Sequence, residues 1–298
     1  MNRIISTNEG PIVEAGVVLT PETVPLRTGP PTREELLVYY PAKFTWEQLK
    51  VFVTSGDLGL LKRDRSLHKR YGEWAVDIVE EYGSVVNYLT SYRLQWGKPD
   101  TRALLRSALD VEYEGPSIAA DTQPQGPEVP QGLPYDAPAY FTAKAPPEYI
   151  SIIQNDWPYS IPADVEHTLI WTRLPIFHPD LIHESVTARV EQDGLWGFTG
   201  LVGPPPDLSL LPTYLPALAE WGITMDRLIR SERGSEEQEE AVRRAGQEVQ
   251  KFVRNRWDET KWETAWFVNP PRLQSVRGLA HVHVFAKQKD VANPNVDV

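Results

Sequence analysis

Apolar side chains recur three and four positions apart along three stretches in the first third of the chain, which is the spacing of one helical face. The first stretch, 45–56, opens with Thr45 and Gln48 in the arrangement of a capping box. The second follows residue 61 and stops at Gly83, a residue type that commonly ends helices. The third covers 84–96. We therefore expect three helices that pack together.

The second half of the chain combines one long helical pattern with segments that favour strands. A second capping box precedes an apolar stripe that continues to Trp257, so one helix over 235–257 is predicted. β-Branched and aromatic residues between turn signals predict strands at 168–172, 262–268 and 280–286, and a strand end with a turn at 196–200. The pattern indicates an α+β fold, a single globular unit whose helices pack on a largely antiparallel sheet.

Proline and charge subdivide this unit. Residues 1–42 are proline-rich and lack a sustained period, so an extended arm is expected there. Residues 43–287 form the predicted catalytic domain, with an acidic, proline-rich insertion at 107–148. Residues 288–298 are expected to form a flexible tail.

Composition excludes several classes of function. The chain has no cysteine, so disulfides, thiolate metal ligands and cysteine nucleophiles are absent. No apolar run approaches the roughly 18 to 20 residues that span a bilayer, and the start lacks a secretory signal, so we expect a cytoplasmic protein without membrane partners. The net charge of -11 argues against indiscriminate binding to DNA. Phosphate-loop, dinucleotide-turn, nucleophile-elbow and zinc-protease motifs are missing, so nucleotide-driven chemistry is not expected.

Two histidines share one face of the strand predicted at 280–286. In His281-Val282-His283-Val284 the side chains alternate, so both imidazoles point to one side and the valines to the other. An imidazole can act as a general acid, a general base or a metal ligand near neutral pH. The alternative is a pair of hydrogen-bonded structural histidines.

A second candidate region lies between residues 155 and 167. Asn155-Asp156-Trp157-Pro158-Tyr159, followed by Asp164, Glu166 and His167, gathers carboxylates, aromatic rings and an imidazole around prolines that restrict the backbone. Carboxylates beside aromatic walls can bind a guanidinium or ammonium group. The alternative interpretation is a solvated loop.

The third candidate is a run of basic residues at 62–70. It holds Lys62, Arg63, Arg65, Lys69 and Arg70, a concentration of charge that can contact a phosphate backbone. Most such runs are solvated helix faces, and this alternative stays open.

Several of these residues resemble a fungal family, the N-acetylglucosamine-induced protein family, some members of which are arginine-containing cyclodipeptide synthases. The resemblance covers most of the chain after Tyr40. Its motifs are Tyr40-Pro41-Ala42-Lys43-Phe44, Leu94-Gln95-Trp96, Asn155-Asp156-Trp157-Pro158-Tyr159, Val165-Glu166-His167 through Trp171, Phe267-Val268-Asn269-Pro270, Ser275 and His281-Val282-His283.

The resemblance implies a tRNA-dependent enzyme that condenses arginyl-tRNA with a second aminoacyl-tRNA into a cyclic dipeptide. An aminoacyl ester is already activated, so neither a cofactor nor a metal is expected. The implied catalytic residues are His167, His281, His283, Asn155 and Ser275. The implied substrate-binding residues are Asp156, Trp157, Tyr159, Glu166, Trp171 and Asn269, with Asp156 and Glu166 for the guanidinium. The basic run would bind tRNA.

Two other functions compete with this one. His281 and His283 could join a carboxylate such as Glu166 in the facial triad of a metal-dependent enzyme. The aromatic pocket could instead belong to a non-catalytic sensor of a sugar or amino compound. A weaker similarity to histidine-triad nucleotide-binding proteins fails because Phe285 stands where the third histidine is needed. The enzymatic hypotheses require 155–167 and 281–283 to line one cleft.

Overall fold

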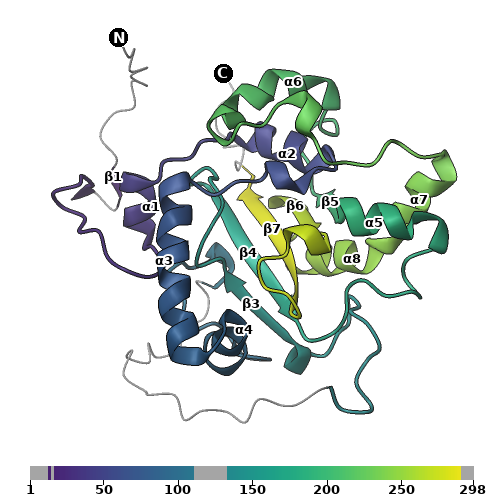
Figure 1. Ribbon diagram of the computed structural model, residues 1–298, viewed down its shortest axis with the longest axis horizontal. Coiled ribbons are helices and arrows are strands. Elements are labelled where there is room, and N and C mark those ends of the chain that lie inside the picture. The colour runs from purple at the N-terminus through teal and green to yellow at the C-terminus, as the bar shows by residue number, and fades with distance from the viewer. Residues whose placement is uncertain (1–12, 15–16, 111–132, 290–298) are drawn as a thin grey trace, which may run out of the picture.

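The structure, a computed structural model, describes residues 13–14, 17–110 and 133–289. Its centre is a five-stranded antiparallel sheet, which confirms the predicted α+β class (Figure 1). In spatial order the strands are β3 (Ile150–Gln154), β4 (Val165–Thr172), β7 (Ala280–Gln288), β6 (Trp262–Val268) and β5 (Leu195–Thr199). A separate two-stranded ribbon joins β1 (Val13–Glu14) to β2 (Val17–Val18).

The sheet buries both faces, against different helices. Val282 and Val284 of β7 pack in the core beneath α8 (Gln247–Arg256), on the side where α5 (Thr187–Asp193) and α7 (Glu236–Ala245) also lie. The opposite face is covered by α2 (Trp46–Thr54), α3 (Arg65–Tyr82) and α4 (Val85–Tyr88). Alternation along β7 therefore turns its histidines toward the N-terminal helices and its valines away, as predicted.

The three N-terminal helices form where the apolar pattern predicts them. Thr45 caps α2 in a capping box with Gln48, and Gly83 ends α3 in the left-handed conformation. Ser84 caps α4, which continues into a π-helical turn, Leu89–Arg93.

Two helical predictions need correction. The expected helix over 235–257 is divided into α7 and α8 at Gly246. A Cβ at Gly246 would lie 2.8 Å from the ring of Trp266, which favours glycine at this position. Within the expected arm, Arg33–Tyr39 form helix α1, which Thr32 caps. The strand β3 and the helices α5 and α6 (Leu211–Tyr214) were not predicted. Short 3-10 turns occupy Leu58–Leu60, Ala108–Asp110, Pro147–Tyr149, Glu184–Val186, Leu208–Leu210, Leu215–Trp221, Met225–Arg227 and Pro271–Leu273.

Parts of the predicted subdivisions lie outside the described residues. These are 1–12 and 15–16 of the arm, 111–132 of the insertion and 290–298 of the tail. The described end of the insertion is not a loose surface loop, because Phe141 is 1% exposed and belongs to the core beneath α8.

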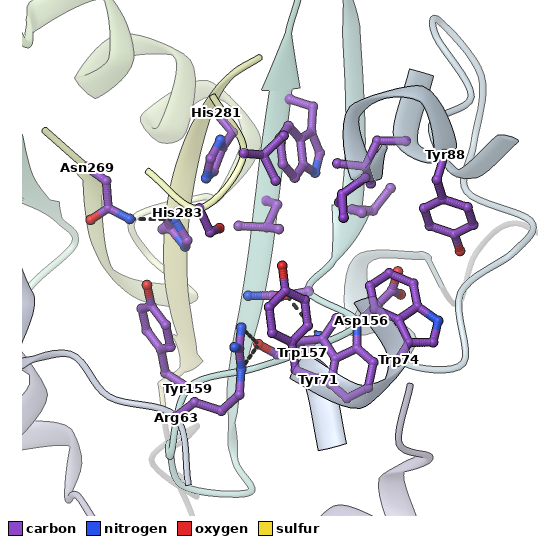
Figure 2. A pocket seen from close by; sticks show the side chains of 18 residues that line it. Arg63, Tyr71, Trp74, Tyr88, Asp156, Trp157, Tyr159, Asn269, His281 and His283 are labelled. Carbon is purple, nitrogen blue, oxygen red and sulfur yellow. Dashed lines mark hydrogen bonds between the residues drawn. The ribbon is translucent and has the colours of Figure 1, made fainter. Parts of the chain in front are cut away.

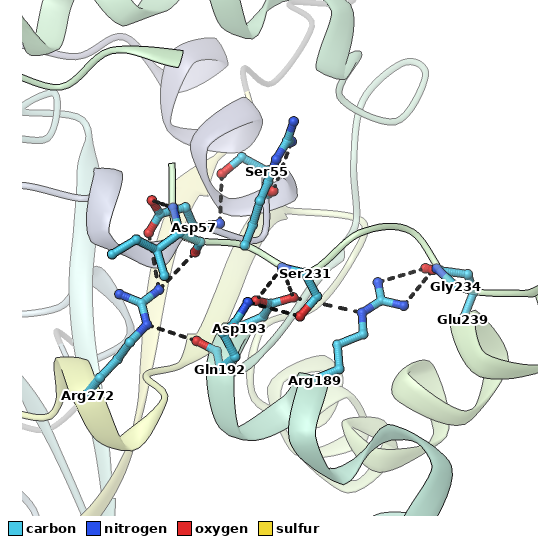
Figure 3. Close-up of polar contacts among 11 residues, drawn as sticks. Ser55, Asp57, Arg189, Gln192, Asp193, Ser231, Gly234, Glu239 and Arg272 are labelled. Carbon is cyan, nitrogen blue, oxygen red and sulfur yellow. Dashed lines mark hydrogen bonds and ion pairs between the residues drawn. The ribbon is translucent and has the colours of Figure 1, made fainter. Parts of the chain in front are cut away.

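Two buried aspartates fasten the segment that follows α6 to the body of the protein (Figure 3). Asp57 accepts the Ile229 N–H at 2.8 Å, and Asp193 accepts the Ser231 N–H at 2.9 Å. Arg272 donates to the carbonyl oxygens of Ile229 and Gln192, both at 3.0 Å. Because these groups satisfy one another, the cluster is a structural fastening.

Gly194 gives a test of backbone packing. It ends α5 at a φ of 81°, and a Cβ would lie 2.3 Å from the backbone oxygen of Val268. We expect Gly194→Ala to destabilise the protein by about 3 kcal/mol, since both the conformation and the contact oppose a side chain. Gly72→Ala is the matched control in α3, where a Cβ meets nothing within 4 Å, and it should stabilise by roughly 0.5 to 1 kcal/mol. Urea denaturation of both variants measures the change in the free energy of unfolding. Equal changes in the two variants would contradict the expectation.

Candidate functional site

A cavity lies between the sheet and helices α3 and α4. It brings together the two stretches that the sequence marked, since Asn155 to Trp157 with Tyr159 line the same space as His281 and His283 (Figure 2). The other lining residues are Arg63, Tyr71, Trp74, Val85, Tyr88, Leu89, Ile153, Leu169, Trp171, Asn269, Ser275 and Val276.

Strand register creates the histidine side of this cavity. Trp171 of β4 lies opposite His281, and Leu169 lies opposite His283. On the other side of β7, Phe267 also pairs with His283 and stacks on its ring at a centroid distance of 4.6 Å. His283 is thereby held between two strands, and His281 is paired with β4.

The hydrogen bonds around His167 determine where the proton of His283 sits. The Tyr159 backbone N–H donates to His167 Nδ1 at 3.2 Å, so this nitrogen is an acceptor and a neutral His167 carries its proton on Nε2. His167 Nε2 lies 3.0 Å from His283 Nδ1 and donates to it. His283 consequently carries its own proton on Nε2, the nitrogen beside Asn269.

Asn269 and His283 together can stabilise a negatively charged oxygen. The side-chain nitrogen of Asn269 lies 3.2 Å from His283 Nε2. Because His283 Nε2 carries a proton, it cannot accept a hydrogen bond from the Asn269 N–H, and an oxygen must accept from His283 instead. Either the amide turns its own oxygen toward the ring, or a ligand oxygen accepts from both N–H groups.

His281 has the opposite polarity. Its Nδ1 lies 3.2 Å from the Leu279 carbonyl oxygen, which can only accept, so the ring proton is on Nδ1 and Nε2 carries a lone pair. Within the described residues, no hydrogen bond reaches this Nε2. The ring packs on Trp171 at a centroid distance of 4.2 Å and lines the cavity. His281 is therefore the acceptor of the pair and His283 the donor.

Burial keeps these rings neutral. Desolvation lowers the pKa of His281 to about 4 and holds the pKa values of His167 and His283 well below the usual value of an imidazole. The positive charge of nearby Arg63 lowers the pKa of His167 and His283 further. At neutral pH the donor and the acceptor are both available without competing protonation.

The far wall of the cavity combines aromatic rings with a carboxylate. Trp157 packs on Trp74 and Tyr71, with centroids 5.2 and 5.3 Å away, and Asp156 lies next to this cluster. Arg93 donates to both oxygens of Asp156, at 2.6 and 2.8 Å, and also binds Asp100. Desolvation lowers the pKa of Arg93, but the charges and hydrogen bonds of the two carboxylates outweigh it and leave that pKa raised. Burial raises the pKa of Asp156.

Arg63 approaches the cavity from the loop before α3. Its Nε and Nη2 both donate to the Trp157 carbonyl oxygen, at 3.0 and 2.8 Å, and its guanidinium lies 4.7 Å from the centre of the Tyr71 ring. The sequence placed this residue on an RNA-binding surface, whereas the structure places it in the pocket wall. Desolvation lowers its pKa.

The rest of the basic run is not one continuous surface. Arg70 is buried and binds Glu35 of α1 at 3.1 Å, so its predicted contact with tRNA has to be corrected. Lys62 is half-buried, and desolvation lowers its pKa. Arg65 and Lys69 are exposed on the first turns of α3, where a polyanion can reach them.

Glu166 also requires correction. Neighbouring residues of a strand face opposite sides, so Glu166 and His167 lie on opposite faces of β4. The cavity borders the face that carries His167, and Glu166 therefore points away from it. It accepts hydrogen bonds from Ser107 Oγ and the Ala108 N–H, both at 2.6 Å, and burial raises its pKa. It can neither bind a substrate guanidinium in the pocket nor complete a facial triad with the two pocket histidines.

The remaining predicted residues have distinct positions. His167 lies behind His283 and does not line the cavity, so it acts on the pocket through its neighbour. Asn155 Oδ1 accepts the Trp157 N–H at 3.0 Å and so holds the loop in shape. Ser275 is exposed and lines the cavity. Arg93, Tyr71, Trp74 and Tyr88 were missed as site residues, although helical spacing had placed three of them on apolar stripes.

Two kinds of feature are absent from the described residues. In the described part of the chain, no group of three or more histidine, aspartate or glutamate side chains could hold a metal ion. Across the same residues, no helix has both the length and the apolar composition needed to cross a membrane.

Comparisons with known proteins place the chain in a family. N-acetylglucosamine-induced protein 1 of Candida albicans is 22% identical over 249 residues, which covers 83% of this chain and 69% of that protein. A solved structure named Crystal Structure of HTC1 covers 82% of this chain and 85% of its own, with 19% identity and a TM-score of 0.36. A family model described as Protein of unknown function (DUF3605) matches residues 45–192 and 227–287. Since these segments make up more than half of the chain, the protein belongs to the DUF3605 family.

Proposed function

We propose that this protein is an acyl-transfer enzyme acting on aminoacyl-tRNA, and specifically a cyclodipeptide synthase that joins arginine to a second amino acid. The observation that carries the proposal is the opposite polarity of His281 and His283 within one aromatic pocket. Aminolysis of an ester needs an acceptor for the amine proton and a donor for the carbonyl oxygen. This pair supplies one of each.

In the proposed first step, the α-amine of one aminoacyl-tRNA attacks the ester carbonyl of the other. His281 Nε2 takes the amine proton while the developing oxyanion accepts from His283 and Asn269. A C–N bond forms, the ester C–O bond breaks, and the departing 3′ oxygen of the tRNA receives a proton. The free amine of the dipeptidyl-tRNA then attacks the second ester, which closes the ring and releases the other tRNA.

The wall around Asp156 suits a cationic side chain. A guanidinium can stack on the rings of Trp74 and Trp157, which are open to cation-π contact. Arg93 uses one hydrogen bond to each oxygen of Asp156, so each oxygen retains a further acceptor site. Asp156 thereby keeps the substrate-binding role that the resemblance implied, although it shares its charge with Arg93.

The tRNA body would contact the exposed start of α3. Arg65 and Lys69 lie there, directly after the loop that brings Arg63 into the pocket. Phosphate contacts of this kind are independent of sequence and weaken with salt. This surface is smaller than the run of five basic residues first indicated.

The experiment that tests the function is incubation of the purified chain with charged tRNAs and a mass-spectrometric search for cyclic dipeptides. We expect an arginine-containing product that disappears when arginyl-tRNA is omitted. His281→Gln should abolish the product, and His183→Gln, a change at an exposed histidine, should leave it intact. Tight binding of an amino compound without any product would instead favour the non-catalytic sensor.

A further inference from the structure

Arg63 carries a positive charge that no acidic side chain neutralises. Among the described residues, no carboxylate lies within 4.0 Å of its guanidinium, and its hydrogen bonds go to the single carbonyl oxygen of Trp157. The nearest acidic group of the pocket, Asp156, is held by Arg93. The Nη1 edge of Arg63 therefore keeps its donors, in a residue that lines the cavity.

The same cavity contains further donors without acceptors. The indole N–H groups of Trp157 and Trp171 are buried and have no hydrogen-bond partner in the described structure. The Nε2 atom of His283 is not among these free donors, because it lies 3.2 Å from the Asn269 amide. Buried polar groups are nearly always satisfied, so an excess of donors in one pocket indicates that a ligand supplies the acceptors.

Arg63 is half-buried, and even partial burial of an unpaired charge is unfavourable. Taking a guanidinium out of water without a counter-ion opposes folding, whereas a bound anion removes most of the penalty. A guanidinium edge with two nitrogen donors fits a carboxylate in two parallel hydrogen bonds. Arg63 is the one unpaired cation among the described lining residues, which matches a single negative charge.

We propose that Arg63 is the anion-binding group for a small molecule with one free carboxylate and an apolar or aromatic body. The body would lie against the rings that line the cavity. This inference goes beyond the proposed function, because an aminoacyl ester has no free carboxylate. The free acid would occupy the same pocket and compete with the ester.

The test uses a matched pair of probes, phenylacetate and its neutral isostere phenylacetamide, in calorimetric titrations of the full chain. We expect phenylacetate to bind at least about tenfold more tightly than the amide, because only the anion neutralises Arg63. Inorganic phosphate, a more highly charged anion, should bind more weakly than phenylacetate. Equal affinity of the two isosteres, preference for phosphate, or no binding of phenylacetate at millimolar concentration would each overturn the proposal.

Variants locate the effect. Arg63→Gln should lower phenylacetate affinity about tenfold or more and leave phenylacetamide affinity unchanged, and Arg63→Lys should restore part of the loss. Arg243→Gln removes an exposed arginine on α7 and should change neither affinity. Circular dichroism confirms that each variant is folded. Since these titrations need no tRNA, they can fail or succeed independently of the synthase assay.

Discussion

Lowering the pH from 7 to 5 is expected to reduce the free energy of unfolding by about 5 kcal/mol, with the three buried histidines as the main cause. Each unfolded imidazole has a pKa near 6.5, whereas burial lowers the folded pKa of His281 to about 4 and those of His167 and His283 well below their usual value. Below pH 6.5 the unfolded state binds more protons. The stabilisation is therefore complete above that pH and is lost as the pH falls toward the folded values.

The size follows from linkage. A histidine that stays neutral in the folded state contributes about 2 kcal/mol over this interval, and three of them approach the total stability of many domains. Glu166 acts with the opposite sign, since burial raises its pKa, and it offsets part of the loss. Hydrogen-bond geometry supports the effect, because a proton on His167 Nδ1 would oppose the Tyr159 N–H.

Urea denaturation at pH 7, 6 and 5 measures this slope. His281→Gln should reduce the pH slope of the free energy of unfolding by the equivalent of about one bound proton. If the slope arises in the pocket, His183→Gln, a change at an exposed histidine, should leave the slope unchanged. If the wild-type free energy of unfolding stays constant between pH 7 and 5, the histidines bind protons as readily in the folded protein as in the unfolded one, which would contradict this prediction.

The second large effect concerns turnover under the proposed function. Replacing His281 by glutamine should lower kcat/KM about 100- to 10,000-fold, because an amide cannot take a proton from the attacking amine. Replacing His283 by glutamine should be milder, since the amide retains an N–H donor for the carbonyl oxygen. His283→Ala, which removes this donor, should lower kcat/KM by the larger factor expected for His281→Gln.

Single-turnover assays with arginyl-tRNA and the second charged tRNA distinguish the two rings. Binding of phenylacetate to His281→Gln shows that the pocket is still formed. Equal losses in His281→Gln and His283→Gln would contradict the assignment of acceptor and donor, and full activity of His281→Gln would remove it from the reaction.

Local spacing was sufficient to predict much of the histidine side of the pocket. Alternation along 280–286 placed His281 and His283 on one face, and helical spacing placed Tyr71 and Trp74 on an inward stripe. The same rule, applied with β4 beginning at Val165, would have separated Glu166 from His167. The error came from a strand start that was predicted too late.

Other features depend on distant partners and leave no local signal. Arg70 lies on the apolar face of α3, yet its partner Glu35 belongs to a segment that lacked a recognisable period. The lack of room for a side chain at Gly246 is due to Trp266, which lies on a different element. The proton position on His283 likewise follows from its contact with His167, which is remote in sequence.

The fastening around Asp57 also joins two segments that reach the cavity from different sides. Arg272 lies 3.4 Å from Asp57, which shortly precedes Arg63 in the sequence. Arg272 itself lies in the sequence between Asn269 and Ser275, which both line the cavity. Arg272, which does not line the cavity, thus connects the loop that carries Arg63 with the loop that carries Asn269. Because Arg272 contacts both segments, we expect its removal to disturb the loop after α6 and the cavity wall together.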